Sequence, residues 1–410
     1  MASSSGTSAS MSSQVSKKGS SSALSTISST STGQEMPPDL ALRLFKEGAT
    51  FVFLNVPVGT EIGIDLQSWN TGEKFRGIKM IPPGLHFLYF SSVSKDHQNL
   101  SPRSGFFHYF EKQEMVVRKY DPRMEILSNE VCPESEVETL KSHMEEMDRF
   151  LGAYPYDMWR KWISLTSRIT APILEKLNPP GGMILSAPEL TLDADQTTSK
   201  SSKPRAKMSK LEQAEDDMPK MTETFESKIR YSRIPSENYP AGSTPAQITK
   251  CQMDTTWKLD NILEAYEKQE DLLAEVQFSF VNFLVGQSYS SFEHWKSLVQ
   301  LVCQSDDAIV KYPKLYTGFV SDLYFQIGEV PQDFFVDIVT CNNFLFSCLQ
   351  TLIQNVKDQG NAEMKLKNKV ARFASFISSK FGWDFEELYD DAPTVVDEAD
   401  AQISTIAEEQ

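Results

Sequence analysis

The spacing of apolar residues changes along the chain and divides it into a β-type half and a helical half. Before Tyr120, apolar and aromatic residues gather in short runs bounded by Gly, Pro, Asn or Asp. Such runs predict short antiparallel strands, here at Thr50–Val56, Gly77–Ile81, Leu85–Ser91, Gly105–Phe110 and Met115–Tyr120. From Lys228 onward, apolar residues recur every three or four positions, which predicts helices. We therefore expect an α+β protein of two domains, the first β-rich and the second all-α.

Breaks in composition set the expected boundaries. The range 1–36 is rich in serine and poor in large apolar residues, so we predict that it is disordered. The β-rich domain with flanking helices is expected at 37–182, closed by the breakers of "NPPGG", and a flexible linker follows over the polar range 183–227. A bundle of antiparallel helices then covers 228–388, and an acidic tail occupies 389–410.

Two helices can be placed from their spacing alone. The apolar residues of "ESEVETLKSHMEEMDRFLG" recur at helical intervals and predict one continuous helix capped by Gly152. In the second domain, apolar residues are frequent on all sides of the segment "DLLAEVQFSFVNFLVGQSYSSFEHWKSLVQLVCQ". That pattern predicts a buried central helix, or a pair of helices broken near Gly286.

Charge and cysteine content narrow the function classes. The net charge of −16 argues against direct binding to nucleic acid, because phosphate recognition requires clusters of lysine and arginine. Five scattered cysteines without a C-x-x-C pair predict reduced thiols inside a cell. No apolar run reaches the roughly 20 residues that cross a bilayer, and the amino terminus lacks the apolar core of a signal peptide. We expect a soluble intracellular protein that contacts no membrane; a mitochondrial transit peptide is a minor alternative.

No catalytic motif is apparent, so we expect neither an enzyme nor a bound cofactor or metal. His86 and His108 fall in separate predicted strands, where a shared metal is imaginable, but they lack ligand spacing and are better explained as structural residues. Glu145, Glu146 and Asp148 form an acidic run that is typical of a solvated helix face.

The stretch "FRGIKMIPPGLHFLYFSS" supports the structural interpretation of His86. Pro83 and Gly84 suit the central positions of a type II turn. Both faces of the strand that follows are largely apolar, with Leu85 on one face and His86 on the other, which predicts a strand covered on two sides.

Several long segments resemble the AAR-two family of pre-mRNA splicing factors, in the same order along the chain. They are "FRGIKMIPPGLHFLYFSS", "LGAYPYDMWRKWISLT", "FEHWKSLVQLVCQSDDAI", "IGEVPQDFFVDIV" and "KFGWDFEE", and the resemblance runs from about Pro37 to Val396. It implies a β-rich domain, a linker and an all-helical, VHS-like domain. It also implies a non-enzymatic assembly chaperone of the U5 snRNP. We expect this protein to be a monomer found in cytoplasm and nucleus.

The resemblance further implies a partner. Family members bind the large Prp-eight scaffold protein in a U5 snRNP precursor, at its RNase H-like and Jab/MPN domains, and block the Brr-two helicase until it takes their place. In the family the carboxy-terminal tail is thought to bridge the two scaffold domains by adding a strand. The matching positions here are Pro393, Thr394, Val395 and Val396. An ordinary solvated tail is the alternative.

Release by phosphorylation is a second property that the family implies. Candidate residues are the serines and threonines of the linker and those near Ser288 to Ser291, because a phosphate would repel an acidic or apolar contact surface. Two other functions stay open at this point. A VHS-like domain also suits a trafficking adaptor, and an unrecognised hydrolase would use His86 or His108.

Overall fold

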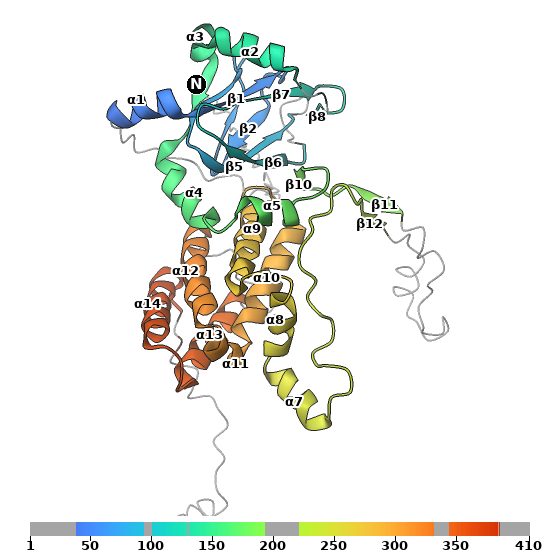
Figure 1. Ribbon diagram of the computed structural model, residues 1–410, viewed down its shortest axis with the longest axis vertical. Helices are drawn as coiled ribbons and strands as arrows, with labels where there is room; N and C mark the ends of the chain where they lie inside the picture. Colours follow the sequence, from blue (N-terminus) through green and yellow to red (C-terminus); the bar gives the residue numbers. More distant parts are fainter. Residues whose placement is uncertain are drawn as a thin grey trace, which may run out of the picture.

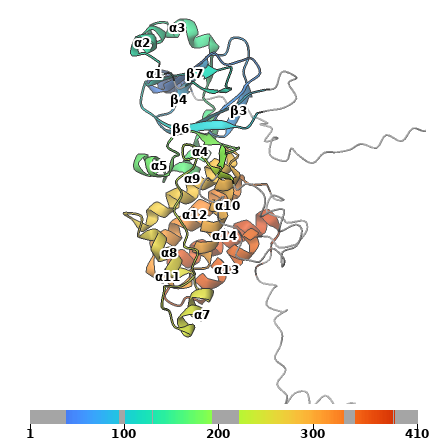
Figure 2. The ribbon, with the colours of Figure 1, turned by 90° about the vertical axis from the view of Figure 1, so that its right-hand side faces the viewer.

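The structure is a computed structural model that describes residues 38–93, 101–128, 130, 132–192, 221–331, 344–383 and 385. A β-rich part lies at one end and a helical part at the other, as Figures 1 and 2 show from two directions. This arrangement confirms the two-domain α+β class. The predicted disordered range 1–36 and the predicted tail 389–410 both lie outside the described residues.

The β-rich domain contains two five-stranded sheets, in the orders β8-β7-β1-β4-β9 and β10-β6-β5-β2-β3. Helix α1 (Pro38–Glu47) precedes them. The strands are β1 (Ala49–Leu54), β2 (Glu61–Ile64), β3 (Gln67–Asn70), β4 (Gly77–Ile81), β5 (Gly84–Ser91), β6 (Ser104–Phe110), β7 (Met115–Asp121), β8 (Ile126–Leu127), β9 (Leu151–Ala153) and β10 (Ile184–Leu185). All five predicted strands are present, whereas β2 and β3 escaped prediction because each has only four residues.

The prediction of a wholly antiparallel domain was wrong. Strand β1 pairs with β7 in parallel, and β4 pairs with β9 in parallel. The chain builds most of the second sheet between β1 and β7, so β7 returns to the first sheet by a long crossover. At the β1–β4 pair the backbones approach closely, and a Cβ added at Gly77 would lie 1.9 Å from the carbonyl oxygen of Phe51.

The prediction of one helix ending at Gly152 was also wrong. The chain forms α2 (Glu134–Ser142) and the short α3 (Met144–Met147), then a 3-10 turn and strand β9. Neither helix buries a residue, while Leu151 is buried and pairs with Gly77. Pairing with the open edge of β4 thus outweighs the helical spacing, and Gly152 lies in a strand instead of a cap.

The second domain is a helical bundle. Helices α4 (Trp159–Thr166) and α5 (Ala171–Leu177) lead into it from the β-rich part. The bundle consists of α7 (Pro245–Met253), α8 (Thr256–Leu263), α9 (Leu272–Leu284), α10 (Tyr289–Cys303), α11 (Asp306–Lys311), α12 (Pro313–Glu329), α13 (Phe344–Asp358) and α14 (Met364–Phe381). Every residue of α9 from Leu272 to Phe283 is buried, and α10 begins after Gly286, which confirms a helix pair with a central buried member.

A continuous apolar core joins the two domains. Leu85, Phe87 and Tyr89 of β5 pack with Phe107 of β6 against the helices. The opposite face of β5 packs into a separate core between the two sheets, so the predicted two-sided strand is confirmed. The ring of Phe107 lies 5.2 Å from that of Phe278 in α9.

The range predicted to be a flexible linker, 183–227, has ordered ends. Strand β10 pairs with β6, and β11 (Leu190–Leu192) pairs with β12 (Met221–Glu223). The part between them lies outside the described residues, and so does the stretch 332–343 before α13. Within the described chain, no helix has the length and apolar character needed to cross a bilayer.

Candidate partner-binding surface at the domain junction

Arg168 fastens the end of α4 to two helices of the bundle. Its Nε donates to Oδ2 of Asp322 at 2.7 Å, and its backbone N–H donates to the side chain of Gln277 at 2.9 Å. Burial raises the pKa of Asp322 to about 6, although the neighbouring Arg168 opposes this shift. Helix α12 comes close here, because a Cβ added at Gly318 would meet the side chains of Leu273 and Arg168 within 3 Å.

Arg103 makes a second connection across the junction. Its guanidinium donates to the carbonyl oxygen of Val285 at 2.7 Å and to Oε1 of Glu61 at 2.9 Å. It also lies 4.3 Å from the centre of the Tyr89 ring. One side chain thereby joins strands β2 and β5 to the end of α9, which fixes the position of the sheet on the bundle.

A groove of about 790 Å³ opens beside these contacts and takes its walls from both domains. Trp69, Arg103, Lys161, Gln287 and Glu329 are among its lining residues. Small-molecule pockets are mostly apolar and enclose their ligand, whereas this groove is bordered by charged groups such as the Lys161–Glu329 ion pair. Its chemistry suits a segment of another protein.

Strand β3 forms one wall of the groove and is an edge strand of its sheet. Its outer backbone groups have no strand partner in the described part of the chain. Trp69 on this strand is 39% exposed, an unusual fraction for a tryptophan. An edge strand next to an exposed aromatic side chain is a suitable template for an extended segment of a partner.

His86 belongs to a closed polar network inside the β-rich domain. Its Nδ1 lies 2.6 Å from Oδ2 of Asp65, and its Nε2 lies 2.8 Å from the carbonyl oxygen of Pro82. Asp65 also accepts from the Tyr154 hydroxyl at 2.6 Å and from the N–H of Phe87 at 2.9 Å. Because His86 and Asp65 are buried and their bonds are directed inward, the structural interpretation of His86 is confirmed.

His108 is opposite His86 in the β5–β6 pair, but the two rings have different hydrogen-bond partners. His108 contacts Oε1 of Glu114 at 2.9 Å and is partly exposed. Among the described residues, no three His, Cys, Asp or Glu side chains come together as metal ligands would. The two histidines therefore act separately, each with its own carboxylate.

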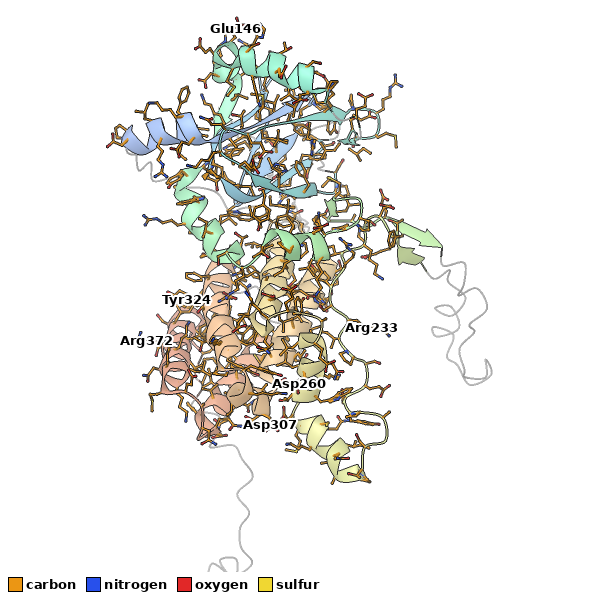
Figure 3. All side chains as sticks on the ribbon, in the orientation of Figure 1. Glu146, Arg233, Asp260, Asp307, Tyr324 and Arg372 are labelled. Atoms are coloured by element: carbon orange, nitrogen blue, oxygen red, sulfur yellow. The ribbon has the colours of Figure 1, made fainter. Side chains whose placement is uncertain are left out.

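The acidic run on α3 behaves as an exposed surface. Glu145 and Glu146 are exposed, and Figure 3 shows Glu146 at the far end of the β-rich domain. Asp148 forms an ion pair with Lys79 at 2.6 Å, which anchors the segment that follows α3. These carboxylates do not converge on a common point, so they form no acid–base pair.

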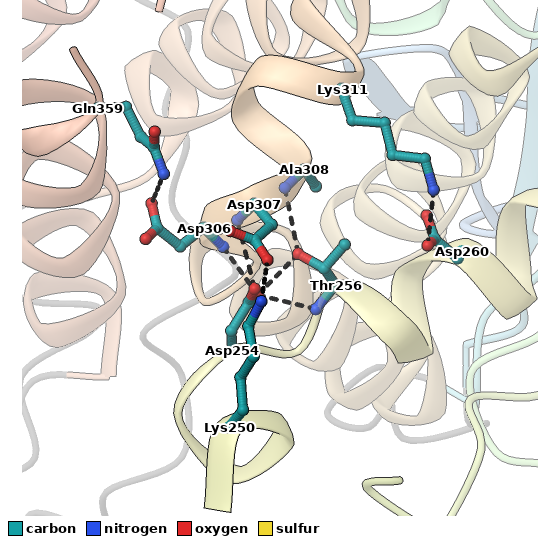
Figure 4. A network of polar contacts seen from close by, with 9 residues as sticks. All are labelled: Lys250, Asp254, Thr256, Asp260, Asp306, Asp307, Ala308, Lys311 and Gln359. Carbon is teal, nitrogen blue, oxygen red and sulfur yellow. Dashed lines mark hydrogen bonds and ion pairs between the residues drawn. The ribbon is translucent and has the colours of Figure 1, made fainter. Parts of the chain in front are cut away.

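A polar network at the far end of the bundle is structural as well (Figure 4). Asp254 accepts from the backbone N–H groups of Thr256 and Asp306, and the Thr256 hydroxyl accepts from the N–H of Ala308. These bonds satisfy N–H groups at the beginnings of α8 and α11, which would otherwise lack partners. The Lys250–Asp307 ion pair reinforces the same corner from α7.

The stretch from Ser288 to Ser291, one candidate for regulation, is largely enclosed. Ser288 caps α10, Ser291 donates to Ser288 and accepts from the Tyr231 hydroxyl at 2.8 Å, and both serines are buried. Ser290 is exposed. Of these three serines, a kinase would therefore reach Ser290 without unfolding the start of α10.

The predicted strand-addition residues Pro393, Thr394, Val395 and Val396 lie outside the described residues, so their role stays a prediction. Sequence reasoning did not find the junction groove. Its walls come from residues as distant as Glu61, Arg103 and Glu329, and no local pattern connects them. The only available signal was Trp69, a large aromatic residue within an otherwise polar stretch.

Comparisons with known proteins agree on one family. Residues 47–179 match the AAR2 N-terminal domain, and residues 231–386 match the AAR2 C-terminal repeat region. "Protein AAR2 homolog" of Macaca fascicularis is 42% identical over 373 residues, which cover 88% of this chain and 97% of that protein. The proteins of the same name from Homo sapiens (41% over 373 residues; 88% and 97%) and Caenorhabditis elegans (35% over 367 residues; 86% and 99%) are also similar. The chain therefore belongs to the AAR2 (AAR-two) family of splicing-related proteins.

Proposed function

We propose that this protein is a non-enzymatic assembly chaperone of the U5 snRNP. In this role it binds the Prp-eight scaffold at its RNase H-like and Jab/MPN domains and delays binding of the Brr-two helicase. Membership of the AAR2 family across both domains supports the proposal. It works as a monomer in cytoplasm and nucleus, and it binds protein and not RNA, in keeping with its net charge of −16.

The observation that carries this function furthest is the groove between two domains that share one core. A chaperone that holds a large scaffold needs a surface whose shape persists while the partner changes. The Arg103 and Arg168 contacts keep the walls of the groove in a constant relation. We propose that this groove, with the edge strand β3, is the contact made by the folded domains.

The tail supplies a second contact in this proposal. Val395 and Val396 add a short strand to an exposed sheet edge of the scaffold, where backbone hydrogen bonds give affinity. Residue 393 is eight positions beyond Phe385, so the strand reaches up to about 26 Å from the folded body. Two linked contacts raise the effective concentration of each for its site, so the pair binds more tightly than either alone.

Capture of the scaffold from cell extract tests this function. The tagged full chain should retain the U5 scaffold protein, and a chain lacking Asp390–Gln410 should retain much less. A groove variant, Trp69→Ala with Lys161→Glu, should also retain less, while Glu146→Lys at the far end of the molecule should behave as wild type. Failure of the full chain to capture the scaffold would contradict the proposal and favour the adaptor alternative.

A further inference from the structure

Helices α13 and α14 form a hairpin with a groove of about 760 Å³ along it, distinct from the groove at the domain junction. Figure 1 shows α14 at the outer side of the bundle and α13 inward of it, and in Figure 2 both helices lie on the same side of the bundle. The floor is apolar, with Ile353 and Val356 from α13 and Val370 from α14. Lys357 and Lys367 line the groove as well, and Trp383 and Phe385 contribute from the segment after α14.

The chain turns back onto this hairpin when α14 ends. Gly382 has a left-handed backbone with φ of 69°, and its N–H donates to the carbonyl oxygen of Ser378 at 2.9 Å. The ring of Trp383 then stacks on that of Phe381 at 4.5 Å. Phe385 is buried and stacks on Phe346 at 5.3 Å. Phe385, the last described residue, therefore lies within the groove region.

The hairpin carries an unbalanced positive charge. Helix α14 contains five basic residues and no acidic one: Lys365, Lys367, Lys369, Arg372 and Lys380. Within the described residues, Lys357, Lys365, Lys367 and Arg372 form no ion pair. The carboxylates nearest in sequence are Asp358 and Glu363, in and beside the connection between the helices. This concentration of cations is notable in a chain with a net charge of −16.

The segment that leaves this surface has the opposite charge. Residues 386–410 contain no basic residue and nine acidic ones: Glu386, Glu387, Asp390, Asp391, Asp397, Glu398, Asp400, Glu408 and Glu409. The first six residues of this segment, 386–391 ("EELYDD"), combine four carboxylates with the apolar pair Leu388 and Tyr389. Their composition matches a groove with an apolar floor and cationic walls.

We propose that residues 386–391 dock into the α13–α14 groove of the same chain. Lys367 and Gly382 are fifteen residues apart in sequence, which corresponds to about 22 Å at the rise of a helix. Six extended residues cover about 20 Å. Starting at Phe385, the segment therefore places Leu388 over the apolar floor and brings Asp390 and Asp391 within reach of Lys357 and Lys367.

Docking gives the tail a fixed point of departure. The predicted strand, Pro393 to Val396, begins two residues after Asp391 and so emerges beside Lys357 instead of moving freely from Phe385. A shorter free tether loses less conformational entropy when the strand binds. This consequence rests on the proposed function, whereas docking itself does not require it.

Hydrogen exchange on the full chain tests the proposal. At 50 mM NaCl, amides of residues 386–391 should exchange at least ten times more slowly than in the free peptide of the same sequence. The protection should fall at 500 mM NaCl, because salt screens exposed charges. Lys357→Glu with Lys367→Glu should abolish it, whereas Lys74→Glu with Lys314→Glu, an equal charge change elsewhere, should retain it.

A charge swap shows whether the two sides meet. By itself, the double variant Asp390→Lys with Asp391→Lys should lose the protection. When it is combined with the two groove substitutions, the protection should return. Exchange at the peptide rate in the wild-type chain would overturn the proposal, and so would equal protection in the groove and control variants. If protection follows these expectations but the scaffold does not bind, the proposed function fails and docking stands.

Discussion

Asp65, Glu275 and Asp322 are buried carboxylates whose partners come from distant parts of the chain. Asp65 and Glu275 each accept at least three hydrogen bonds, and Asp322 bonds Arg168 and Gln277. A buried charge is tolerated only when it is paired and hydrogen-bonded. Each of these residues consequently fixes the segments around it, and each gives a measurable prediction.

Asp65→Ala should destabilise the protein strongly. The substitution leaves His86, Tyr154 and the N–H of Phe87 buried without their acceptor, at a cost of about 3 to 5 kcal/mol. Tyr154→Phe removes one donor only and should cost about 1 kcal/mol. Urea unfolding measures both; an Asp65→Ala variant as stable as wild type would show that the network does not contribute.

Glu275 should make stability dependent on acid pH. Burial opposes its ionisation, but bonds from His294, Tyr266 and the Ser232 N–H outweigh burial and lower its pKa from the ordinary 4.5. The charged form therefore contributes stability that is present above pH 4.5 and is lost as pH falls through the lower folded-state pKa. Glu275→Gln should flatten this part of the stability profile; an unchanged slope between pH 5 and 3 would contradict the assignment.

The role of His86 was predictable from its sequence context, but its partner was not. An apolar strand that contains a single histidine points to a buried structural ring. Asp65, however, follows the short strand β2, which carries too few residues to be recognised. Pairing between strands that are distant in the sequence brought the two residues together.

At the scale of elements, helical spacing was a reliable guide where helices could bury a face and misleading where they could not. Helices α9 and α10 appeared as expected, because α9 is buried on all sides and α10 buries one face. The segment after Glu134 has similar spacing, yet α2 and α3 bury nothing and the chain turns into β9. Tertiary pairing with β4 decided the outcome, and single-sequence spacing contains no information on an open sheet edge.

The contact between α4 and α12 should respond to pH in the opposite sense from Glu275. The pKa of Asp322 is raised to about 6, so the folded state binds more protons than the unfolded state between pH 3.8 and 6. Its contribution to stability is thus fully present below pH 3.8 and is lost as pH rises through 6. Asp322→Asn should remove this pH dependence, which thermal unfolding from pH 4 to 7 measures. If the stability of the variant still declined as pH rises, the dependence would belong to another group.

At the scale of the whole molecule, the shared core predicts that the two domains unfold together. Residues of β5 and β6 pack into the same apolar cluster as α9, α10 and α12. Calorimetry should show one transition, and Phe107→Ala should lower its midpoint without splitting it, at a cost of about 3 to 5 kcal/mol. Two separate transitions, of which Phe107→Ala shifts only one, would contradict a common core.

The sequence allowed prediction of the fold class and the family, but not the surface that the proposal assigns to partner binding. The periodicity of apolar residues and the resemblance to the family are both properties of contiguous segments, so each segment can be interpreted by itself. The junction groove depends instead on the positions of residues such as Glu61 and Glu329 in the finished fold. Functional surfaces assembled from several elements are therefore the part that sequence reasoning missed.

The central claim is that this protein binds the U5 scaffold with its tail as well as with its folded domains. One titration tests this claim most directly. The full chain is titrated into a purified scaffold fragment with the RNase H-like and Jab/MPN domains, as wild type and as Val395→Lys with Val396→Asp. We expect the variant to bind at least tenfold more weakly, about 1.4 kcal/mol, with an unchanged melting temperature. Equal affinity of the two proteins, or no binding by the wild type, would contradict the account.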